Sequence, residues 1–255
     1  MKRIGIIGGM SFESTLHYYE QINQEVYKRT HGLAFPDLVI RSVNFQEYRK
    51  LMEKGDWCEI AHRLKFEALD LVFKNKCEYV AIATNTMHKV ADLVIGPHEV
   101  AHEVVGNAAW PPISRWINIP LVHIGDCIAE ECKEVNAKRV LLLGTEITMT
   151  DYFMKDYLLN FGIIAMGTRN YPEEIKKINR IIFEELCHGI VTLESKQFMV
   201  NFINQFPADS DERPDAIILG CTELNMILEP GDVDIPLIDS TKAHIDKLVN
   251  LCLEN

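Results

Sequence analysis

The same strand-to-loop plan occurs twice in this chain, and this internal repeat restricts its possible folds more than any other feature. In the first half an apolar run ends in Gly8-Gly9 and a later run leads into Thr84. In the second half the corresponding runs end at Gly144 and lead into Cys221. By subtraction of residue numbers, 76 positions separate Gly8 from Thr84 and 77 separate Gly144 from Cys221. We therefore expect two copies of one α/β lobe, with Thr84 and Cys221 on opposite sides of a single cleft.

Apolar runs of strand length alternate with amphipathic stretches of helical period. The apolar runs fall at 4–7, 38–43, 79–83, 119–124, 139–143, 162–166 and 216–219. The helical stretches fall at 13–29, 57–75, 126–135, 151–160, 173–188, 195–206 and about 240–253. Unbroken apolar strands separated by helices are typical of parallel sheets that are covered on both faces. The predicted fold is α/β, with two pseudo-symmetric doubly wound parallel-sheet lobes. The active site is expected in the cleft between them, because ligands of such sheets bind beyond the carboxyl ends of the strands.

The boundary between the lobes is predicted near Ile119-Pro120. Residues 1–118 together with about 226–255 form the first lobe in this interpretation, and residues 119–225 form the second. Residues 91–118 have no counterpart in the second half and are interpreted as an insertion. Such an insertion would form a lid, a subunit contact or a surface excursion without function.

Charge, cysteine content and hydropathy exclude several functional classes. The formal net charge is −11 and no basic stripe exists to displace counterions from phosphates, so a nucleic-acid partner is not expected. The seven cysteines form no C-x-x-C pair, which favours a reducing compartment over a disulfide framework. No uncharged apolar stretch is long enough to span a bilayer, and a buried strand explains the first apolar run better than a signal peptide does. We expect a cytoplasmic protein without a membrane partner.

Cys221 has a sequence context that suits a reactive thiol. It follows a buried strand and Gly220, and it precedes Thr222-Glu223, which could open a helix. A helix dipole and nearby backbone N–H groups favour the thiolate, so a lowered pKa is expected. The same position is compatible with an inert core cysteine. Asn85-Thr86 and Thr222-Glu223 follow the two candidate nucleophiles and would form anion cradles, helix caps or both.

Four separated motifs together resemble the aspartate/glutamate racemase family. In chain order they are Gly8-Gly9-Met10-Ser11-Phe12-Glu13-Ser14-Thr15, Thr84-Asn85-Thr86-Met87-His88, Leu143-Gly144-Thr145 with Thr148, and Gly220-Cys221-Thr222-Glu223. The Cys-Thr-Glu form is similar to the aspartate racemase branch, and the match covers nearly the whole chain apart from residues 91–118. The resemblance implies a PLP-independent racemase that uses no cofactor, acts on small acidic amino acids and is often a homodimer.

The mechanism implied by the resemblance needs one group on each face of the substrate Cα. One thiolate removes the proton and a thiol on the opposite face returns one, while fixed amides and hydroxyls stabilise the enediolate-like carboxylate. This chain departs from the pattern because Thr84 stands where the first catalytic cysteine is usual. In related racemases the second-lobe thiol handles the L-enantiomer, so the resemblance implies that Cys221 deprotonates this enantiomer. Because a hydroxyl is a far weaker acid than a thiol, Thr84 is expected to act through its hydroxyl, a relay or water. Racemisation should therefore favour L-aspartate or L-glutamate.

The resemblance also implies a set of substrate-binding residues. Those that match family motifs are Met10, Ser11, Asn85, Thr86, Thr145, Thr148, Thr222 and Glu223. Arg49, expected in the loop after the second strand, resembles an arginine that binds the distal carboxylate, although a solvated charge at a helix start explains it equally well. Glu185 is a further candidate, for the substrate ammonium.

Residues 98–102 match the H-E-x-x-H zinc-protease motif, with His98 and His102 as the two potential ligands and Glu99 as the potential base. Pro97 permits a helix start directly before them. The motif lies inside the insertion, however, and no third ligand is identifiable, so no metal is assigned. Incidental metal binding, structural metal binding and a plain helix stay open.

Two other functions are compatible with the same residues. Decarboxylases related to this family work on malonate-type acids with a single second-lobe cysteine. A non-catalytic protein that closes two lobes on an amino acid would also need no second thiol. The choice between aspartate and glutamate depends on one methylene of pocket depth, which the sequence does not show.

Overall fold

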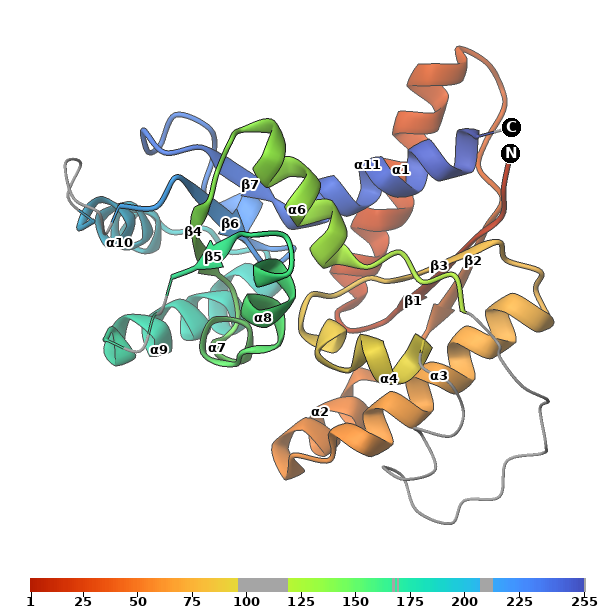
Figure 1. Ribbon diagram of the computed structural model, residues 1–255, viewed down its shortest axis with the longest axis horizontal. Coiled ribbons are helices and arrows are strands. Elements are labelled where there is room, and N and C mark those ends of the chain that lie inside the picture. Colours follow the sequence, from red (N-terminus) through yellow and green to blue (C-terminus); the bar gives the residue numbers. More distant parts are fainter. Residues whose placement is uncertain (96–118, 167, 169, 207–212, 255) are drawn as a thin grey trace. The chain divides into compact units, whose positions relative to one another are not determined.

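The computed structural model describes residues 1–95, 119–166, 168, 170–206 and 213–254. The chain forms two compact units, one of Met1–His123 with Ile245–Asn255 and the other of Ile124–His244 (Figure 1). Each unit contains a parallel sheet with helices, which confirms the α/β fold predicted from the apolar runs. None of the helices in the described part of the chain is both long and apolar enough to cross a membrane.

The first unit is built on a three-stranded parallel sheet with the order β2-β1-β3. Its strands are β1 (Ile4–Gly8), β2 (Leu38–Ser42) and β3 (Tyr79–Ile82). Its helices are α1 (Phe12–Thr30), α2 (Phe45–Lys54), α3 (Trp57–Phe73), the 3-10 helix η1 (Thr86–Val90), α4 (Ala91–Ile95) and most of α11 (Ser240–Leu253).

Helices cover both faces of this first sheet. Figure 1 shows α1 and α11 on one side and α3 and α4 on the other. Ile7 and Ile82 of the sheet pack in one cluster with Ile60 and Leu64 of α3, and all four side chains are fully buried. Each such side chain contributes roughly 1.5–3 kcal/mol to stability through the area that it removes from water. The buried strands therefore fix the carboxyl ends of β1 and β3 on a rigid support.

The second unit is built on a four-stranded parallel sheet with the order β5-β4-β6-β7. Its strands are β4 (Arg139–Leu143), β5 (Ile164–Ala165), β6 (Ala216–Leu219) and β7 (Leu237–Asp239). Its helices are α6 (Ile124–Glu134), α7 (Glu146–Thr150), α8 (Phe153–Leu159), α9 (Pro172–Arg180), the π-helix η2 (Ile181–Glu185), the 3-10 helices η3 (Leu186–His188) and η4 (Leu224–Met226), and α10 (Leu193–Asn204).

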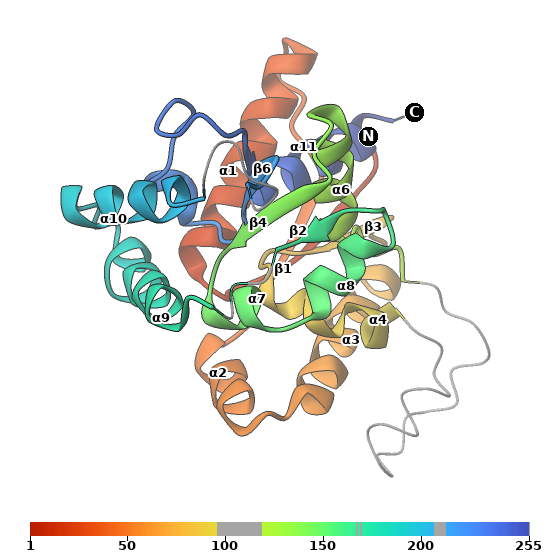
Figure 2. The ribbon, with the colours of Figure 1, turned by 60° about the vertical axis from the view of Figure 1, so that its left-hand side comes forward.

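Alternate residues of β4 in this second sheet face different helices. Leu141 and Leu143 pack in one cluster with side chains of α9, η2 and α10. Val140 and Leu142 pack in another cluster with side chains of α6 and α8. Figure 2 shows the same arrangement, with α9 and α10 on one side of β4 and α6 and α8 on the other. This is the doubly wound layering expected for unbroken apolar strands.

The strand register shows that the two units are repeats of one plan. Ile7 pairs with Ile82 in the first sheet, and Leu143 pairs with Leu219 in the second. One residue further on, the amide of Ala83 donates to the carbonyl of Ile7 at 2.9 Å, and the amide of Gly220 donates to that of Leu143 at 2.7 Å. The residues that follow are Thr84 and Cys221. They therefore occupy equivalent positions, as the sequence spacing predicted.

The repeat continues into a segment that begins with proline. The amide of Val80 donates to the carbonyl of Pro120 at 2.9 Å, and the amide of Ile217 donates to that of Pro236 at 2.8 Å. The segment after Pro236 is β7. The segment after Pro120 forms only an isolated bridge, because the chain turns into α6 at Ile124. The apolar run 119–124 was thus wrongly predicted to be a full strand.

The compact units also differ from the predicted lobe boundaries. Residues 119–123 group with the first unit through their bridge to β3. Residues 226–244 belong to the second unit, because β7 pairs with β6. In each repeat the chain leaves its unit shortly after this last strand segment, between residues 123 and 124 and between residues 244 and 245. The final helix then returns to the first unit, where the carbonyl of Cys252 accepts from the amide of Lys2 at 2.9 Å.

Candidate active site

A glycine turn joins β1 to α1 in the first unit. Gly9 has a φ of +89°, and a Cβ atom there would lie 2.3 Å from the carbonyl oxygen of Val43. Only glycine avoids both the backbone strain and the clash. The amide of Gly9 donates to Oγ1 of Thr15 at 2.7 Å, and Oγ1 of Thr15 donates to the carbonyl of Ser11 at 2.9 Å. These bonds hold Met10 and Ser11 at the carboxyl end of the sheet.

Ser11 and Ser14 connect the start of α1 to the end of β3. The side chain of Ser11 caps α1 by accepting a hydrogen bond from the amide of Ser14 at 3.2 Å. Oγ of Ser14 donates to the carbonyl of Ala83 at 2.9 Å. Since Ala83 directly precedes Thr84, the glycine turn and the first candidate catalytic residue are fixed to each other. Helix capping and the role as part of a binding cradle are therefore compatible here.

Thr84 is held from the other side by a buried histidine. Nδ1 of His88 lies 2.9 Å from the carbonyl oxygen of Thr84. A carbonyl can only accept, so Nδ1 carries the proton and Nε2 presents a lone pair. Burial lowers the pKa of His88 to about 4, and hence the imidazole is neutral near pH 7. The ring of His123 lies edge-on to that of His88, with ring centroids 4.7 Å apart.

Two glycines bring the strand ends of the second unit close together. A Cβ atom on Gly220 would lie 2.8 Å from the carbonyl oxygen of Leu143, and one on Gly144 would lie 2.9 Å from the carbonyl oxygen of Gly220. The hydroxyl of Thr145 caps the short helix α7 by accepting from the amide of Thr148 at 3.4 Å, and the two threonine hydroxyls lie 3.1 Å apart. The expected motif residues of this unit thus gather at the carboxyl ends of β4 and β6.

Cys221 and Thr222 both donate a hydrogen bond to the same carboxylate oxygen of Glu223. Sγ of Cys221 donates to Oε2 of Glu223 at 2.8 Å, and Oγ1 of Thr222 donates to the same oxygen at 2.6 Å. Cys221 is buried, with 8% of its surface exposed. Burial raises the pKa of the Cys221 thiol well above its ordinary value, and the Glu223 carboxylate raises it further. At rest the group is a thiol.

The thiol state corrects the expectation of a lowered pKa at Cys221. That expectation required an α-helix to start after the cysteine. The structure instead has a single turn of 3-10 helix at Leu224–Met226, whose small dipole does not offset a carboxylate in direct contact. Cys221 also packs in the apolar core of the second unit, so the inert-core interpretation stays open. Glu223 has only 7% of its surface exposed.

A model of the Asp/Glu/hydantoin racemase family matches residues 7–248. The chain belongs to this family. The resemblance read from the four motifs is therefore confirmed.

Three relatives illustrate how far the similarity extends. The broad specificity amino-acid racemase RacX of Bacillus subtilis (strain 168) is 23% identical over 265 residues, with 98% of each chain covered. The crystal structure of a candidate Asp/Glu racemase from Yersinia pestis is 34% identical, covers 100% of both chains and has a TM-score of 0.83. That of an aspartate racemase homologue from Pyrococcus horikoshii OT3 is 35% identical, covers 100% of both chains and has a TM-score of 0.78.

Two of the residues assigned from the family resemblance lie on helices rather than at strand ends. Arg49 is in α2 and not in a loop, because Asn44 caps that helix immediately after β2. Its guanidinium pairs with Glu53 at 3.0 Å, and 70% of its side chain is exposed. Glu185 ends the π-helix and accepts from the hydroxyls of Ser195 at 2.7 Å and Thr192 at 3.2 Å. In this state each has partners within its own unit, and substrate contacts of either residue stay predictions.

Sequence reasoning overlooked three residues that support the backbone at the strand ends of the first unit. Ser14, Thr15 and His88 all stand inside the quoted motifs, but none was assigned a role. Their hydroxyl and imidazole groups support the backbone next to Ser11 and Thr84. The signal was available in part, because serine and threonine side chains frequently bond to backbone groups three or four residues before them, as Thr15 does with Ser11.

The potential zinc motif at residues 98–102 lies outside the described residues. Within the residues that the structure does describe, no group of three or more histidine, cysteine, aspartate or glutamate side chains could hold a metal ion.

Proposed function

We propose that this member of the racemase family is a cofactor-independent amino-acid racemase, acting on aspartate, glutamate or both by removal and return of the Cα proton. The observation that carries the proposal is the pair formed by Cys221 and Glu223, because it supplies a thiol together with a group that can take its proton. Thr84 occupies the equivalent position of the first repeat.

The proposed reaction begins with activation of the thiol. The proton on Sγ of Cys221 passes to Oε2 of Glu223 along the existing 2.8 Å hydrogen bond, which leaves a thiolate and a neutral carboxylic acid. The thiolate then takes the Cα proton of the L-enantiomer, and the electron pair of the C–H bond moves into the substrate carboxylate. Such proton transfers to a well-placed base accelerate reactions typically by about 10²–10⁴-fold.

Return of the proton on the opposite face of Cα is assigned to Thr84. Its hydroxyl, directly or through water, gives the proton and is reprotonated by solvent, and Glu223 releases the proton that it took from Cys221 to solvent. Because an alcohol is a poorer acid than a thiol, this half of the reaction is slower than in an enzyme with two cysteines. We therefore propose faster turnover from the L-enantiomer than from the D-enantiomer.

The developing enediolate needs fixed hydrogen-bond donors. We assign this role to the backbone and hydroxyl groups at the strand ends, with Ser11, Asn85 and Thr86 from the first repeat and Thr145, Thr148 and Thr222 from the second. Met10 contributes apolar contact. Arg49 would exchange its exposed partner Glu53 for the distal carboxylate of the substrate, and Glu185 is assigned to the ammonium group. We further propose a cytoplasmic homodimer with no nucleic-acid or membrane partner.

One observation favours a second candidate reaction. Only one of the two equivalent positions carries a thiol, and a decarboxylase of malonate-type acids needs a proton donor on a single face. Such an enzyme would lose carbon dioxide from the substrate, and the Cys221 thiol would protonate the same kind of enediolate.

Chiral chromatography of product formed from L- and D-aspartate and from L- and D-glutamate tests the proposal. Wild-type protein should convert at least one of these pairs, faster from the L-form, and Cys221→Ser should reduce the rate by at least a hundredfold. Conversion of none of the four by a folded wild-type protein would contradict the proposal. Release of carbon dioxide from phenylmalonate under the same conditions would then support the decarboxylase.

A further inference from the structure

A pocket of about 530 Å³ lies in the first unit, and its lining includes neither Gly9 nor Thr84. It is enclosed by the end of β2, by the first half of α2 and by one face of α3. Its volume falls within the range of about 300–1,000 Å³ that is usual for small-molecule sites. No step of the proposed racemase reaction uses its side chains.

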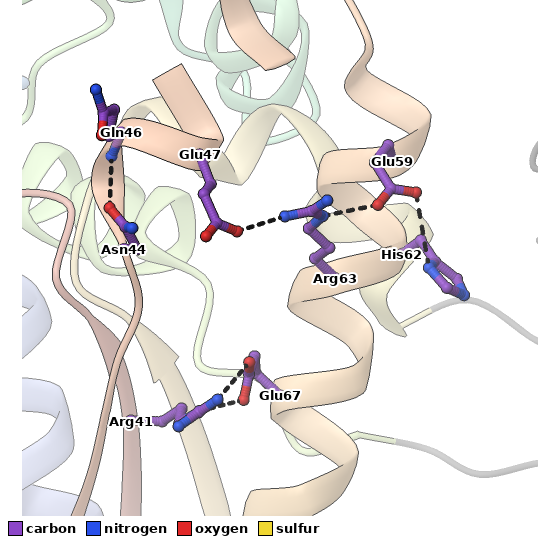
Figure 3. Close-up of polar contacts among 8 residues, drawn as sticks. All are labelled: Arg41, Asn44, Gln46, Glu47, Glu59, His62, Arg63 and Glu67. Carbon is purple, nitrogen blue, oxygen red and sulfur yellow. Dashed lines mark hydrogen bonds and ion pairs between the residues drawn. The ribbon is translucent and has the colours of Figure 1, made fainter. Parts of the chain in front are cut away.

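Charged residues cross this pocket from both walls (Figure 3). Nη1 of Arg63 on α3 lies 2.9 Å from Oε2 of Glu47 on α2, and Nε of Arg63 lies 2.7 Å from Oε1 of Glu59. One turn further along α3, Glu67 accepts both Nε and Nη2 of Arg41 from β2, the second at 3.1 Å. Guanidinium and carboxylate groups therefore alternate along the pocket.

The rest of the lining is partly aromatic. Phe66 lies between the two sets of ion pairs along α3 and is 47% exposed. Tyr48 forms part of the buried side of the pocket. Burial raises the pKa of Tyr48 to about 12, so its phenol stays neutral. An apolar group of a ligand would find its contacts here.

The charge pattern selects the chemistry of the ligand. The lining has two arginines and one histidine against three glutamates, and each glutamate already pairs with one of these basic side chains. An anion alone would displace a carboxylate and leave it without a partner. A simple cation would separate the arginines from their glutamates and bring them no new partner. A zwitterion supplies one charge of each sign and leaves none unpaired. Glu47 is the easiest partner to displace, because 57% of its side chain is exposed and exposed ion pairs contribute little.

We propose that this pocket binds a free α-amino acid with an apolar side chain. The ligand carboxylate takes the place of Glu47 on Arg63, the ligand ammonium pairs with the released Glu47 and with Glu59, and the side chain lies against Phe66. None of the residues that line this pocket is among those assigned to the racemase substrate.

The pocket shares part of its wall with the glycine turn. Ser42 and Val43 line the pocket. The amide of Val43 also donates to the carbonyl of Gly8 at 2.9 Å, and the backbone of Val43 lies against Gly9. A ligand that releases Glu47 loosens α2 from α3 directly after this segment. Bound amino acid should therefore alter substrate affinity at Ser11. This regulatory part rests on the proposed racemase function, whereas the binding site itself does not.

Isothermal titration calorimetry with L-leucine tests the site without any need for catalysis. Wild-type protein and Cys221→Ser should both show saturable binding of one equivalent. Arg63→Gln and Phe66→Ser should each weaken the affinity at least tenfold. Arg180→Gln should leave it unchanged, because it removes a matched exposed i,i+4 pair, with Glu184, from the second unit. Isopentylamine and N-acetyl-L-leucine, which lack the carboxylate and the ammonium respectively, should bind at least tenfold more weakly.

The outcomes separate the site from the active site. Absence of saturable binding to wild type, or equal affinity in Arg63→Gln and Arg180→Gln, would overturn the proposal. Loss of leucine binding in Cys221→Ser would also overturn it, since the ligand would then occupy the catalytic position. If Arg63→Gln fails to fold by circular dichroism, Phe66→Ser decides, because an exposed ring can be removed at small cost. For the regulatory part, saturating L-leucine should change KM for aspartate at least fivefold, and an unchanged KM would overturn the coupling.

Discussion

The sulfur of Cys221 and Oε2 of Glu223 lie 2.8 Å apart at the carboxyl end of β6, with the hydroxyl of Thr222 bound to the same oxygen. This relationship decides how the thiol can act. A buried thiol beside a carboxylate is protonated at rest, and in the proposed reaction it becomes a base when that carboxylate accepts its proton.

The carboxylate of Glu223 has two assigned effects: it raises the pKa of Cys221, and it accepts the thiol proton. The Glu223→Gln substitution should separate them. The amide keeps the size of the side chain but removes the negative charge that raises the pKa of Cys221. The pKa of the thiol should fall, and the rate of alkylation by iodoacetamide at pH 8 should rise about tenfold for each unit of that fall. Racemisation should fall by about 10²-fold or more, because the proton acceptor is gone.

The matched control for this prediction is Glu184→Gln, which removes an exposed carboxylate from the same unit. This substitution should change neither the rate of alkylation nor the rate of racemisation. Slower alkylation in Glu223→Gln than in wild type would contradict the assigned role of Glu223.

Thr84→Cys should make the rates of reaction from the D- and L-enantiomers more nearly equal. A thiol at this position is a stronger acid and, once ionised, a better base than the hydroxyl, so kcat/KM for the D-enantiomer should rise about tenfold or more. Thr84→Val, which has the same shape without a hydroxyl, should lower inversion in both directions. Chiral chromatography of both time courses measures these effects. No gain on the D-form in Thr84→Cys would argue against a role for this face.

Protonation of His88 should weaken the fold in acid. The pKa is lowered from 6.5 in the unfolded chain to about 4 in the folded protein, mainly by burial. Between these two values the unfolded state binds more protons than the folded state. The stability that depends on neutral His88 is therefore fully present above pH 6.5 and is lost as the pH drops toward 4. The full loss corresponds to roughly 3 kcal/mol.

Denaturant unfolding at several pH values measures this loss. His88→Gln keeps a donor for the carbonyl of Thr84 but does not titrate, so its stability should lack this acid-dependent component. His17→Gln, at a half-buried position in α1, serves as the control and should keep it. An identical pH dependence in wild type and His88→Gln would show that His88 is not the group responsible.

Gly9→Ala should destabilise the protein far more than an alanine at another glycine with positive φ. The new Cβ would lie 2.3 Å from a backbone oxygen of Val43 that cannot move away without breaking the link to Gly8. We expect a loss of roughly 3 kcal/mol or more in the free energy of unfolding. Gly55 has a φ of +71° and nothing within 4 Å of its added Cβ, so Gly55→Ala should cost only about 1–2 kcal/mol. Equal losses in urea denaturation would contradict the importance of this contact.

The strands and the repeat were predictable because their signals are local. The strands β1, β3, β4 and β6 are unbroken apolar runs, and equal spacing from Gly8 to Thr84 and from Gly144 to Cys221 indicated equivalent positions. Helix α2 was missed, although Asn44 and Gly55 stand at its two ends as cap residues. Its apolar residues Phe45, Tyr48, Leu51 and Met52 recur at helical spacing, so the signal was present in the sequence. The repeated Ile-Pro-Leu at residues 119–121 and 235–237 was also overlooked, and it marks the last strand segment of each unit.

The chemistry of the site was less predictable, because it depends on where side chains point. Nothing in the sequence shows that the carboxylate of Glu223 turns back toward Cys221, so a lowered pKa was expected where the structure indicates a raised one. In the same way, the hydroxyls of Thr192 and Ser195 reach Glu185 from a different helix. It stays a prediction that the two lobes face each other across a common cleft.

Proton NMR in D₂O tests the central claim most directly. L- and D-aspartate and L- and D-glutamate are incubated separately with wild-type protein and with Cys221→Ser, and the Cα proton signal is followed. The account predicts loss of this signal from an L-enantiomer with wild type, slower loss from the matching D-enantiomer, and none above background with Cys221→Ser. Loss that persists in Cys221→Ser, or none from any of the four amino acids with wild type, would contradict Cα deprotonation by Cys221.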